Sequence, residues 1–254
     1  MNRKRKIIGI VGGAGPFAGI DLQQKILQQT VATRDQEFLP VIALSDPGRI
    51  PDRTAFLLGE TVENPAGPIY QQLRQLEAAG AQVAAIPCNT AHAAAIDDQV
   101  RRRLAQAGSK LTYLHMIREV RAILVGHTPP LTRVGLLATK GTVFSTVYQE
   151  TLAPAGIEVL LPAAAQQEQV QQAIYDPRVG IKALGDRAHQ AREVLSGVAA
   201  SLVKQGAEAF ILGCTEIPVV VRERVWQDRP AIDPTLILAR ALIREADPGR
   251  LRHM

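Results

Sequence analysis

The sequence predicts an α/β protein made of two similar lobes, each a short, mostly parallel sheet flanked by helices. Hydrophobic residues make up 46% of the 254 positions but aromatic residues only 4%. Aliphatic side chains must therefore fill the core, as they do in parallel sheets that helices cover on both faces. Short apolar runs alternate with longer stretches that suit helices. This order of segments occurs twice along the chain, which indicates two similar halves with one cleft between them.

Apolar runs predict the strands, and the segments between them predict the helices. In the first half we expect strands at residues 6–11, 39–44, 83–86 and 111–114, and helices at 17–30, 68–79, 90–107 and 116–125. In the second half we expect strands at 133–138, 156–161, 209–212 and 231–234, and helices at 143–152, 166–175, 183–205, 219–225 and 235–246. The first lobe is expected to contain residues 1–115 together with 228–254, and the second lobe residues 116–227.

The two cysteines occupy the same place in each half. Cys88 lies 76 positions after Gly12, and Cys214 lies 75 positions after Thr139, where Gly12 and Thr139 follow the first strand of each half. Each cysteine directly follows an apolar run, so each is expected at the carboxyl end of a parallel strand. Open α/β sheets bind their ligands at these ends. We therefore expect both cysteines to face one cleft.

Two opposed thiols can invert a carbon centre. An ordinary thiol has a pKa of about 8.5, which is close enough to neutral pH for it to act as a base or as an acid. One cysteine would remove a proton from one face of a carbon, and the other would return a proton to the opposite face. The carbanion of an amino acid needs hydrogen bonds to its carboxylate, and Asn89, Thr90 and Thr215 stand beside the cysteines. This chemistry needs no metal or organic cofactor.

Other interpretations of the cysteines stay open at this point. A cysteine at a strand end is often a small buried hydrophobic residue. A redox pair is also conceivable, but the chain contains no C-x-x-C. His92, four residues after Cys88, could act as its base, tune its reactivity or serve as a structural partner.

Two loops provide further candidates. The loop at residues 12–16 could bring its backbone close to a ligand, with Gly13 as a candidate substrate contact. A tight strand-to-helix turn explains the loop equally well, and it lacks the G-x-G-x-x-G of dinucleotide sites. The loop at residues 45–53 is rich in proline, glycine and charge, and long ordered loops are often functional. Arg53 in this loop could grip a carboxylate through paired hydrogen bonds, or could simply be solvated.

Composition excludes several classes of partner and location. The formal charge is +5 with a pI near 9.5, but the basic runs fall at the chain ends and on one expected helix. No aromatic residues are interleaved with them as single-strand binding requires, so we expect no nucleic-acid partner. Residues 2–20 superficially resemble a signal peptide, but a strand followed by a glycine loop explains them better. No other stretch approaches the ~20 apolar residues of a membrane span. With no disulfide framework, we expect a cytoplasmic protein.

Five motifs together resemble a known family. They are Gly12-Gly13-Ala14-Gly15-Pro16, Ile50-Pro51-Asp52-Arg53-Thr54, Pro87-Cys88-Asn89-Thr90-Ala91-His92, Thr139-Lys140-Gly141-Thr142 and Gly213-Cys214-Thr215-Glu216. In content and order they resemble the aspartate/glutamate racemase superfamily, and within it the aspartate racemase branch of cofactor-independent amino acid racemases. The resemblance covers essentially the whole chain.

The resemblance implies two lobes related by a pseudo-twofold, with the active site in the cleft between them, and a homodimer without cofactor. It implies proton transfer by Cys88 and Cys214. The contacts to the substrate carboxylate fall on Asn89, Thr90 and Thr215. The contacts to the side-chain carboxylate of aspartate fall on Arg53 and on Lys182, the latter in the segment Gly180-Ile181-Lys182-Ala183.

The chain departs from the family at one visible position. Ala14 stands where the family usually has methionine, which leaves the size of the substrate open. Glutamate racemases resemble the chain less, because they carry histidine where Glu216 stands. Arg53 and Lys182 together favour an acidic side chain, since a pocket with two cations would bind a neutral amino acid poorly.

The predicted function is therefore racemisation of an acidic amino acid, L-aspartate to D-aspartate, by proton transfer between two cysteines. One alternative is a racemase or epimerase for another amino acid, or a related isomerase of a dicarboxylate. A second alternative is a protein that binds a small carboxylate on the same fold without turnover. The presence of both cysteines and both cations argues against the second alternative.

Overall fold

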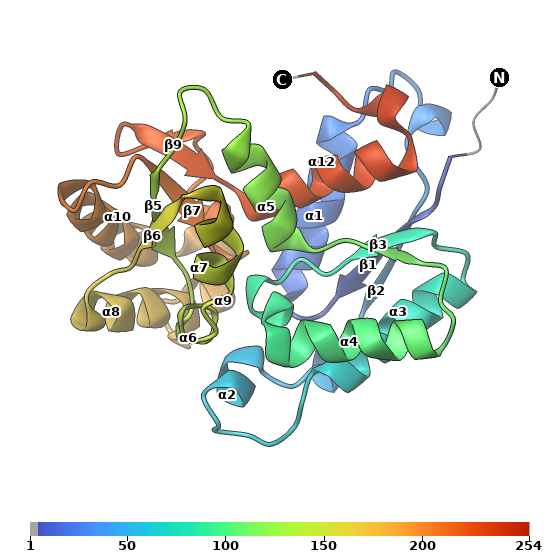
Figure 1. The fold of residues 1–254 in the computed structure, drawn as a ribbon, viewed down its shortest axis with the longest axis horizontal. Helices are drawn as coiled ribbons and strands as arrows, with labels where there is room; N and C mark the ends of the chain where they lie inside the picture. The colour runs from blue at the N-terminus through green and yellow to red at the C-terminus, as the bar shows by residue number, and fades with distance from the viewer. Residues whose placement is uncertain (1–4, 254) are drawn as a thin grey trace.

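Two parallel sheets, each covered by helices, form the two lobes of the protein. The computed structural model describes residues 5–253 (Figure 1). The first sheet has the strand order β2-β1-β3-β4, and the second has the order β6-β5-β7-β9-β8. Among these strands, β8 and β9 alone pair in antiparallel fashion. The predicted fold class, α/β with two lobes, is confirmed.

The strands are short, and all except β8 overlap the predicted places. Those of the first sheet are β1 (Ile8–Gly12), β2 (Val41–Ser45), β3 (Val83–Ala85) and β4 (Thr112–Tyr113). Those of the second sheet are β5 (Arg133–Leu137), β6 (Glu158–Leu160), β7 (Ala209–Leu212), β8 (Val225–Trp226) and β9 (Arg229–Ile232).

Helices flank both sheets and connect them. Those that belong to the first lobe or link it to the second are α1 (Pro16–Gln29), α2 (Arg53–Leu57), α3 (Ala66–Ala78), α4 (Ala94–Gln106), α5 (Met116–Val125) and α12 (Pro234–Ala246). Those of the second lobe are α6 (Lys140–Phe144), α7 (Val147–Leu152), α8 (Ala164–Tyr175), α9 (Ile181–Leu184), α10 (His189–Lys204) and α11 (Ile217–Val220). None of the helices between residues 5 and 253 is both long and apolar enough to cross a membrane.

The two sheets repeat one topology. In each lobe the first strand lies between the second and the third, and all three run parallel. The carboxyl ends of parallel strands meet at one edge, so the loops after β1 and β3 leave the first sheet together. The loops after β5 and β7 do the same in the second sheet. Cys88 and Cys214 therefore start from equivalent edges.

Each sheet separates two layers of aliphatic side chains. On one face of the first sheet, Ile8 and Ile10 of β1 pack with α1 and α12. On the other face, Val11 and the alternate residues of β3 pack against α3 and α4. This alternation follows from the two-residue period of a strand. Both faces are apolar, which explains why the strands are continuous hydrophobic runs.

The C-terminal segment is divided between the lobes, which corrects one boundary. The sequence predicts residues 229–232 in the first lobe, but they form β9, which pairs with β7 in the second sheet. One edge of β7 pairs with β5, and residues 229–232 pair with its other edge. The chain from α12 onwards returns to the first lobe, where α12 packs along α1 and α5 (Figure 1) and Leu251 pairs with Thr30. Asp233 caps the start of α12 by accepting hydrogen bonds from Thr235 N and Leu236 N.

Four expected helices differ in the structure. The helix at 90–107 is a 3₁₀ turn at Asn89–His92 followed by α4. The helix at 143–152 is interrupted by Thr146, whose φ of 54° is left-handed, so α6 and α7 are separate. Gly185, with φ of 60°, divides the long helix at 183–205 into α9 and α10. In place of a helix at 219–225, α11 ends at Val220 and β8 follows.

The lobes meet through small and polar groups around α2 and α6, whereas α5 and α12 pack apolar side chains against the second lobe. Gly141 at the start of α6 lies against Thr54 of α2, where an added Cβ would be 2.7 Å from the Thr54 Cα. The hydroxyls of Thr90 and Thr142 lie 2.8 Å apart across the contact. Tyr148 donates a hydrogen bond of 2.6 Å from its hydroxyl to the Asn89 side chain. Around α2 and α6, the contact between the lobes thus depends on close approach at a glycine and on a few hydrogen bonds.

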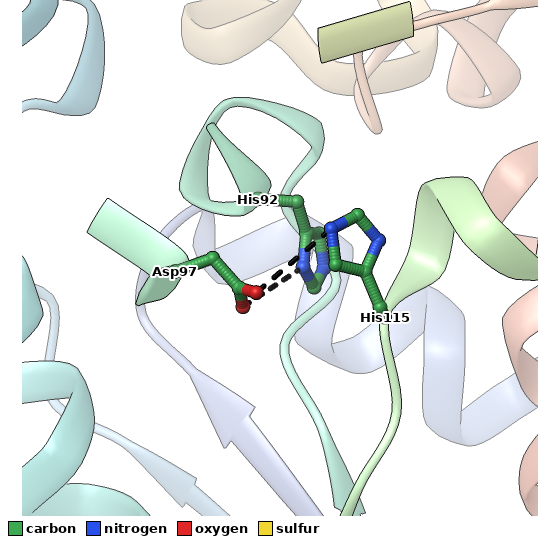
Figure 2. A group of neighbouring side chains, drawn as sticks. All are labelled: His92, Asp97 and His115. Atoms are coloured by element: carbon green, nitrogen blue, oxygen red, sulfur yellow. Dashed lines mark ion pairs between the residues drawn. The ribbon is translucent and has the colours of Figure 1, made fainter. Parts of the chain in front are cut away.

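A buried polar cluster lies behind the Cys88 turn (Figure 2). His92 Nδ1 is 3.6 Å from one oxygen of Asp97, and His115 Nε2 is 3.9 Å from the other. Arg101 donates to the same carboxylate at 2.5 Å. His92 belongs to the turn that follows Cys88, Asp97 to α4, and His115 caps α5. The cluster therefore ties the turn to two neighbouring helices.

Replacing Gly141 with alanine is expected to destabilise the protein by about 1–3 kcal/mol, because the new Cβ would overlap Thr54 and force the lobes apart. Gly197→Ala is the matched control. It lies within α10, where an added Cβ would have nothing within 4 Å, so it should be neutral or stabilising by up to about 1 kcal/mol. Urea unfolding measures both, and equal effects would contradict the close contact.

Acid should destabilise the fold through His115. Burial and the neighbouring His92 lower the pKa of His115 to about 3, whereas an unfolded histidine titrates near 6.5. Between these values the unfolded chain binds more protons than the folded one, so stability should fall as pH falls from about 6.5 towards 3. His115→Asn keeps a helix cap and should flatten this slope. Exposed His189→Asn should leave it unchanged. Denaturant unfolding at pH 7, 6 and 5 gives the slopes, and parallel slopes for parent and His115→Asn would refute the assignment.

Candidate functional site

A closed cavity lies where the two lobes meet, and both cysteines line it. Its lining consists of Ala14, Arg53, Cys88, Asn89, Thr90, Thr139, Tyr175, Lys182, Cys214, Thr215 and Glu216. All the residues that the sequence suggested for the site are among them except Gly13 and His92. The free volume is about 10 Å³, which is on the order of the space that one water molecule needs. An amino acid can enter only if the lobes or the lining side chains move.

On the first-lobe side, Cys88 lies beside a buried guanidinium. Arg53 is 8% exposed and opens α2, where Asp52 caps the helix. Its Nη2 donates to Ala14 O and its Nη1 to Pro51 O, while its Nε has no protein partner. Burial by itself lowers the pKa of Arg53, but Cys88 and Asp52 outweigh it and raise that pKa above its ordinary value. A permanent cation thus faces the cavity.

Asn89 presents an unused donor to the cavity. The Tyr148 hydroxyl donates to Asn89 Oδ1, which orients the amide. Asn89 Nδ2 is then buried with no partner within the described chain. An unsatisfied buried donor costs about 1–3 kcal/mol, so a ligand oxygen placed there would recover that energy. The hydroxyl of Thr90 is shared with Thr142 at 2.8 Å and Thr139 at 3.3 Å.

On the second-lobe side, Cys214 lies in a chain of charged groups. Its Sγ donates a hydrogen bond of 2.9 Å to Glu216 Oε2. The other oxygen of Glu216 lies 2.6 Å from the ammonium of Lys182. Burial and then the charge of Glu216 raise the pKa of the Cys214 thiol well above its ordinary value. Burial tends to raise the pKa of Glu216, but Lys182, the hydrogen bond from Cys214 and Arg53 together outweigh it and keep that pKa low.

Three lining residues were missed as site candidates. Glu216 and Thr139 stand inside motifs that the sequence presents. Glu216 lies two residues after Cys214, and Thr139 lies two residues after the end of β5, so their positions could have identified them. Tyr175 ends α8 and belongs to no motif. Its hydroxyl donates to Asp52 Oδ2 at 3.1 Å, across the lobes. The ammonium of Lys182 lies 5.1 Å from the centre of its ring.

Gly13 does not line the cavity. Its φ is +89°, and an added Cβ would lie 2.8 Å from the backbone between Asp46 and Pro47. The position needs glycine so that two loops can pass closely. A substrate contact for Gly13 stays a prediction.

His92 also lies outside the lining, and it interacts with Asp97 rather than with Cys88. This geometry favours the structural role among the three that the sequence left open. Ligand atoms of His92, Asp97 and His115 lie within 4.8 Å of one another, a spacing that a metal ion could use. However, Arg101 already places a cation on Asp97, which disfavours a second cation there.

Comparison with known proteins agrees with this architecture. The sequence model of the Asp/Glu/hydantoin racemase family matches residues 11–242. The aspartate racemase of Picrophilus torridus has a similar structure, with a TM-score of 0.82 and 29% identity, covering 98% of this chain and 96% of that one. The broad specificity amino-acid racemase RacX of Bacillus subtilis is 24% identical over 244 residues, 93% of this chain and 96% of that protein.

A shorter match involves an uncharacterized protein of Pectobacterium carotovorum. It is 40% identical over 94 residues, which are 37% of this chain and 59% of that protein. The family match, by contrast, runs from β1 to α12 and includes both cysteines. This protein therefore belongs to the Asp/Glu/hydantoin racemase family.

Proposed function

We propose that the protein interconverts the enantiomers of an acidic amino acid, L-aspartate and D-aspartate, by cofactor-independent transfer of the α-proton between Cys88 and Cys214. One observation carries the proposal. Cys88 and Cys214 come from equivalent strand ends of different lobes, and both line one buried cavity with Arg53 and Lys182.

The proton transfer needs one thiolate and one thiol on opposite faces of the substrate. The thiolate takes the proton from the α-carbon, and the other thiol protonates the resulting carbanion from the far side. The cysteines exchange roles for the reverse reaction. The carbanion is stabilised if its charge spreads into a carboxylate that accepts hydrogen bonds. The unpaired Asn89 Nδ2 is suited to this task, and Thr90 and Thr215 lie in the same lining.

The side-chain carboxylate of the substrate would meet Arg53 and Lys182. Arg53 is buried and its Nε has no partner, so a carboxylate could bind it without breaking an existing ion pair. Lys182 already pairs with Glu216, so the substrate must share or displace that carboxylate. Two cations favour an acidic side chain over a neutral one.

Turnover requires the cavity to open. Its free volume of about 10 Å³ is too small for an amino acid, and hydrogen bonds join the lobes beside it. Domain closure around a substrate excludes water and completes a catalytic site in many enzymes. We infer that the structure corresponds to the closed arrangement, and that substrate enters when the lobes separate.

A second candidate is a racemase with wider substrate range. Ala14 lines the cavity where the resemblance leads one to expect methionine, and a relative of similar length is described as a broad specificity amino-acid racemase. Exchange of the α-proton with solvent deuterium, scanned over L- and D-amino acids, separates the candidates. Exchange with aspartate supports the first, and exchange confined to other amino acids supports the second. Binding without any exchange would instead indicate a carboxylate-binding protein.

The homodimer and the cytoplasmic location remain predictions within this proposal. Cys88 and Cys214 are both unpaired, which is compatible with a reducing compartment. Light scattering of the purified protein measures its oligomeric state.

Either cysteine should be indispensable for racemisation. Cys88→Ser and Cys214→Ser are each expected to lower kcat at least about 100-fold, because the loss of a general acid or base typically costs 10²–10⁴. Circular dichroism of aspartate solutions over time measures the rate. Binding of succinate, a dicarboxylate without a stereocentre, should stay within about threefold as the control for an intact site. Full activity in either variant would refute the two-cysteine mechanism.

Arg53 should discriminate acidic from neutral substrates. Arg53→Ala is expected to raise KM for aspartate at least tenfold, since loss of a buried charge partner costs about 2–5 kcal/mol. For alanine as substrate the change should be much smaller. Arg49→Ala, an exposed arginine in the same loop, is the matched control and should leave both unchanged. Equal effects of Arg53→Ala on the two substrates would rule out a side-chain contact.

A further inference from the structure

Glu216 holds Cys214 and Lys182 together inside the cavity. Its Oε2 accepts hydrogen bonds from Cys214 Sγ at 2.9 Å and from the Thr215 hydroxyl at 3.3 Å. Its Oε1 accepts from Lys182 Nζ at 2.6 Å. The Glu216 side chain is 4% exposed, and a Cβ on Gly15 would lie 2.8 Å from its Oε1. The carboxylate is therefore held in one place, with both oxygens in use.

The surroundings of the two cysteines differ in charge. A carboxylate accepts the proton of Cys214, whereas the cation Arg53 lies beside Cys88. The negative neighbour favours the thiol form of Cys214. The lobes are alike in topology, but the site between them is electrostatically asymmetric.

We propose that Glu216 is a positioning residue that shares one proton with Cys214, and that Lys182 determines which of the two groups holds it. This inference rests on the proposed function, because it assigns a proton partner to one of the two cysteines of that reaction.

The charges around the pair support this arrangement. Lys182 from α9 faces Glu216 directly, and Arg53 from α2 also acts on it. Tyr175 from α8 and Tyr148 from α7 adjoin Cys214 with hydroxyls whose pKa burial raises above the ordinary value, so they stay neutral. Lys182 keeps the pKa of Glu216 low while burial and Glu216 raise that of Cys214. In the substrate-free site the proton therefore rests on sulfur.

Substrate binding would reverse this preference. A substrate carboxylate that pairs with Lys182 removes the main cation from Glu216, whose affinity for a proton then rises because it is buried. The S–H bond of Cys214 breaks, an O–H bond forms on Glu216 Oε2, and the electron pair stays on sulfur. The resulting thiolate can accept the α-proton of the substrate, after which Glu216 retains or releases its proton. Cys214 thus serves as an acid at rest and as a base once substrate has bound.

The titration of Cys214 tests the proposal without any turnover. In the Cys88→Ser protein Cys214 is the only thiol, so its alkylation by iodoacetamide between pH 6 and 10, followed by mass spectrometry, reports its thiolate fraction. We expect a midpoint above the ordinary value of about 8.5. Adding Glu216→Gln should lower the midpoint by at least about one pH unit, a roughly tenfold faster reaction at pH 8. Adding Lys182→Met should lower it as well, because Glu216 without its cation takes the proton from sulfur; a midpoint that rises instead would refute the role of Lys182. Glu223→Gln, a surface carboxylate paired with Arg192, should leave it unchanged.

The outcomes separate this inference from the proposed function. A structural effect of either substitution would change the plateau rate through access, but it would not move the midpoint. If the midpoint of the Glu216→Gln protein equals that of its parent, the proton-sharing pair is refuted, even if Cys214→Ser abolishes racemisation. If Cys214→Ser retains full racemisation while the midpoints shift as expected, the pair stands and the proposed mechanism fails.

Discussion

The parallel pairing of the first and third strands in each lobe is the constraint on which the rest of the protein depends. It sends the loops that follow β1 and β3 out of one edge of the first sheet, and those after β5 and β7 out of the matching edge of the second. Both cysteines stand in the loop that follows the third strand. Facing the two edges towards each other is then enough to enclose both sulfur atoms in one cavity. A shift by one residue in either strand would move its side chains to the opposite face of the sheet.

The contact between the lobes is close, and the proposed function requires it to open. Apolar side chains of α5 and α12 pack against the second lobe, whereas Gly141, several threonine hydroxyls and two tyrosine hydroxyls make the contact beside the cavity. Such hydrogen bonds can be exchanged for water at small net cost. A site with space for about one water molecule can therefore be dry when closed and still admit a ligand when open. The cluster of His92, Asp97 and His115 stiffens the turn after Cys88 from behind, so the movement does not have to originate there.

The two lobes share a topology, but the charges around their cysteines differ. Arg53 beside Cys88 comes from α2 of the first lobe, while Lys182 and Glu216 beside Cys214 come from α9 and the loop after β7. The two halves thus supply different charges to sulfur atoms in equivalent positions. In the proposed reaction, which runs in both directions, each thiol takes part in the same kind of proton transfer. The two thiols do so beside different charged neighbours. The family relationship is established by the match over most of the chain, and the choice of substrate depends on how these charges accommodate a second carboxylate.

The sequence by itself determined the class of the fold, the duplicated order of strands and the placement of both cysteines after buried strands. These follow from local patterns of apolar residues and glycine, which act over a few positions. It could not determine where long helices break, because Thr146 and Gly185 adopt left-handed conformations that packing imposes. Nor could it place residues 229–232 in the second sheet, since only the open edge of β7 decides that pairing. The partners of Glu216 and Tyr175 were decided by tertiary structure alone, because Lys182 and Asp52 approach them from segments 34 and 123 residues away.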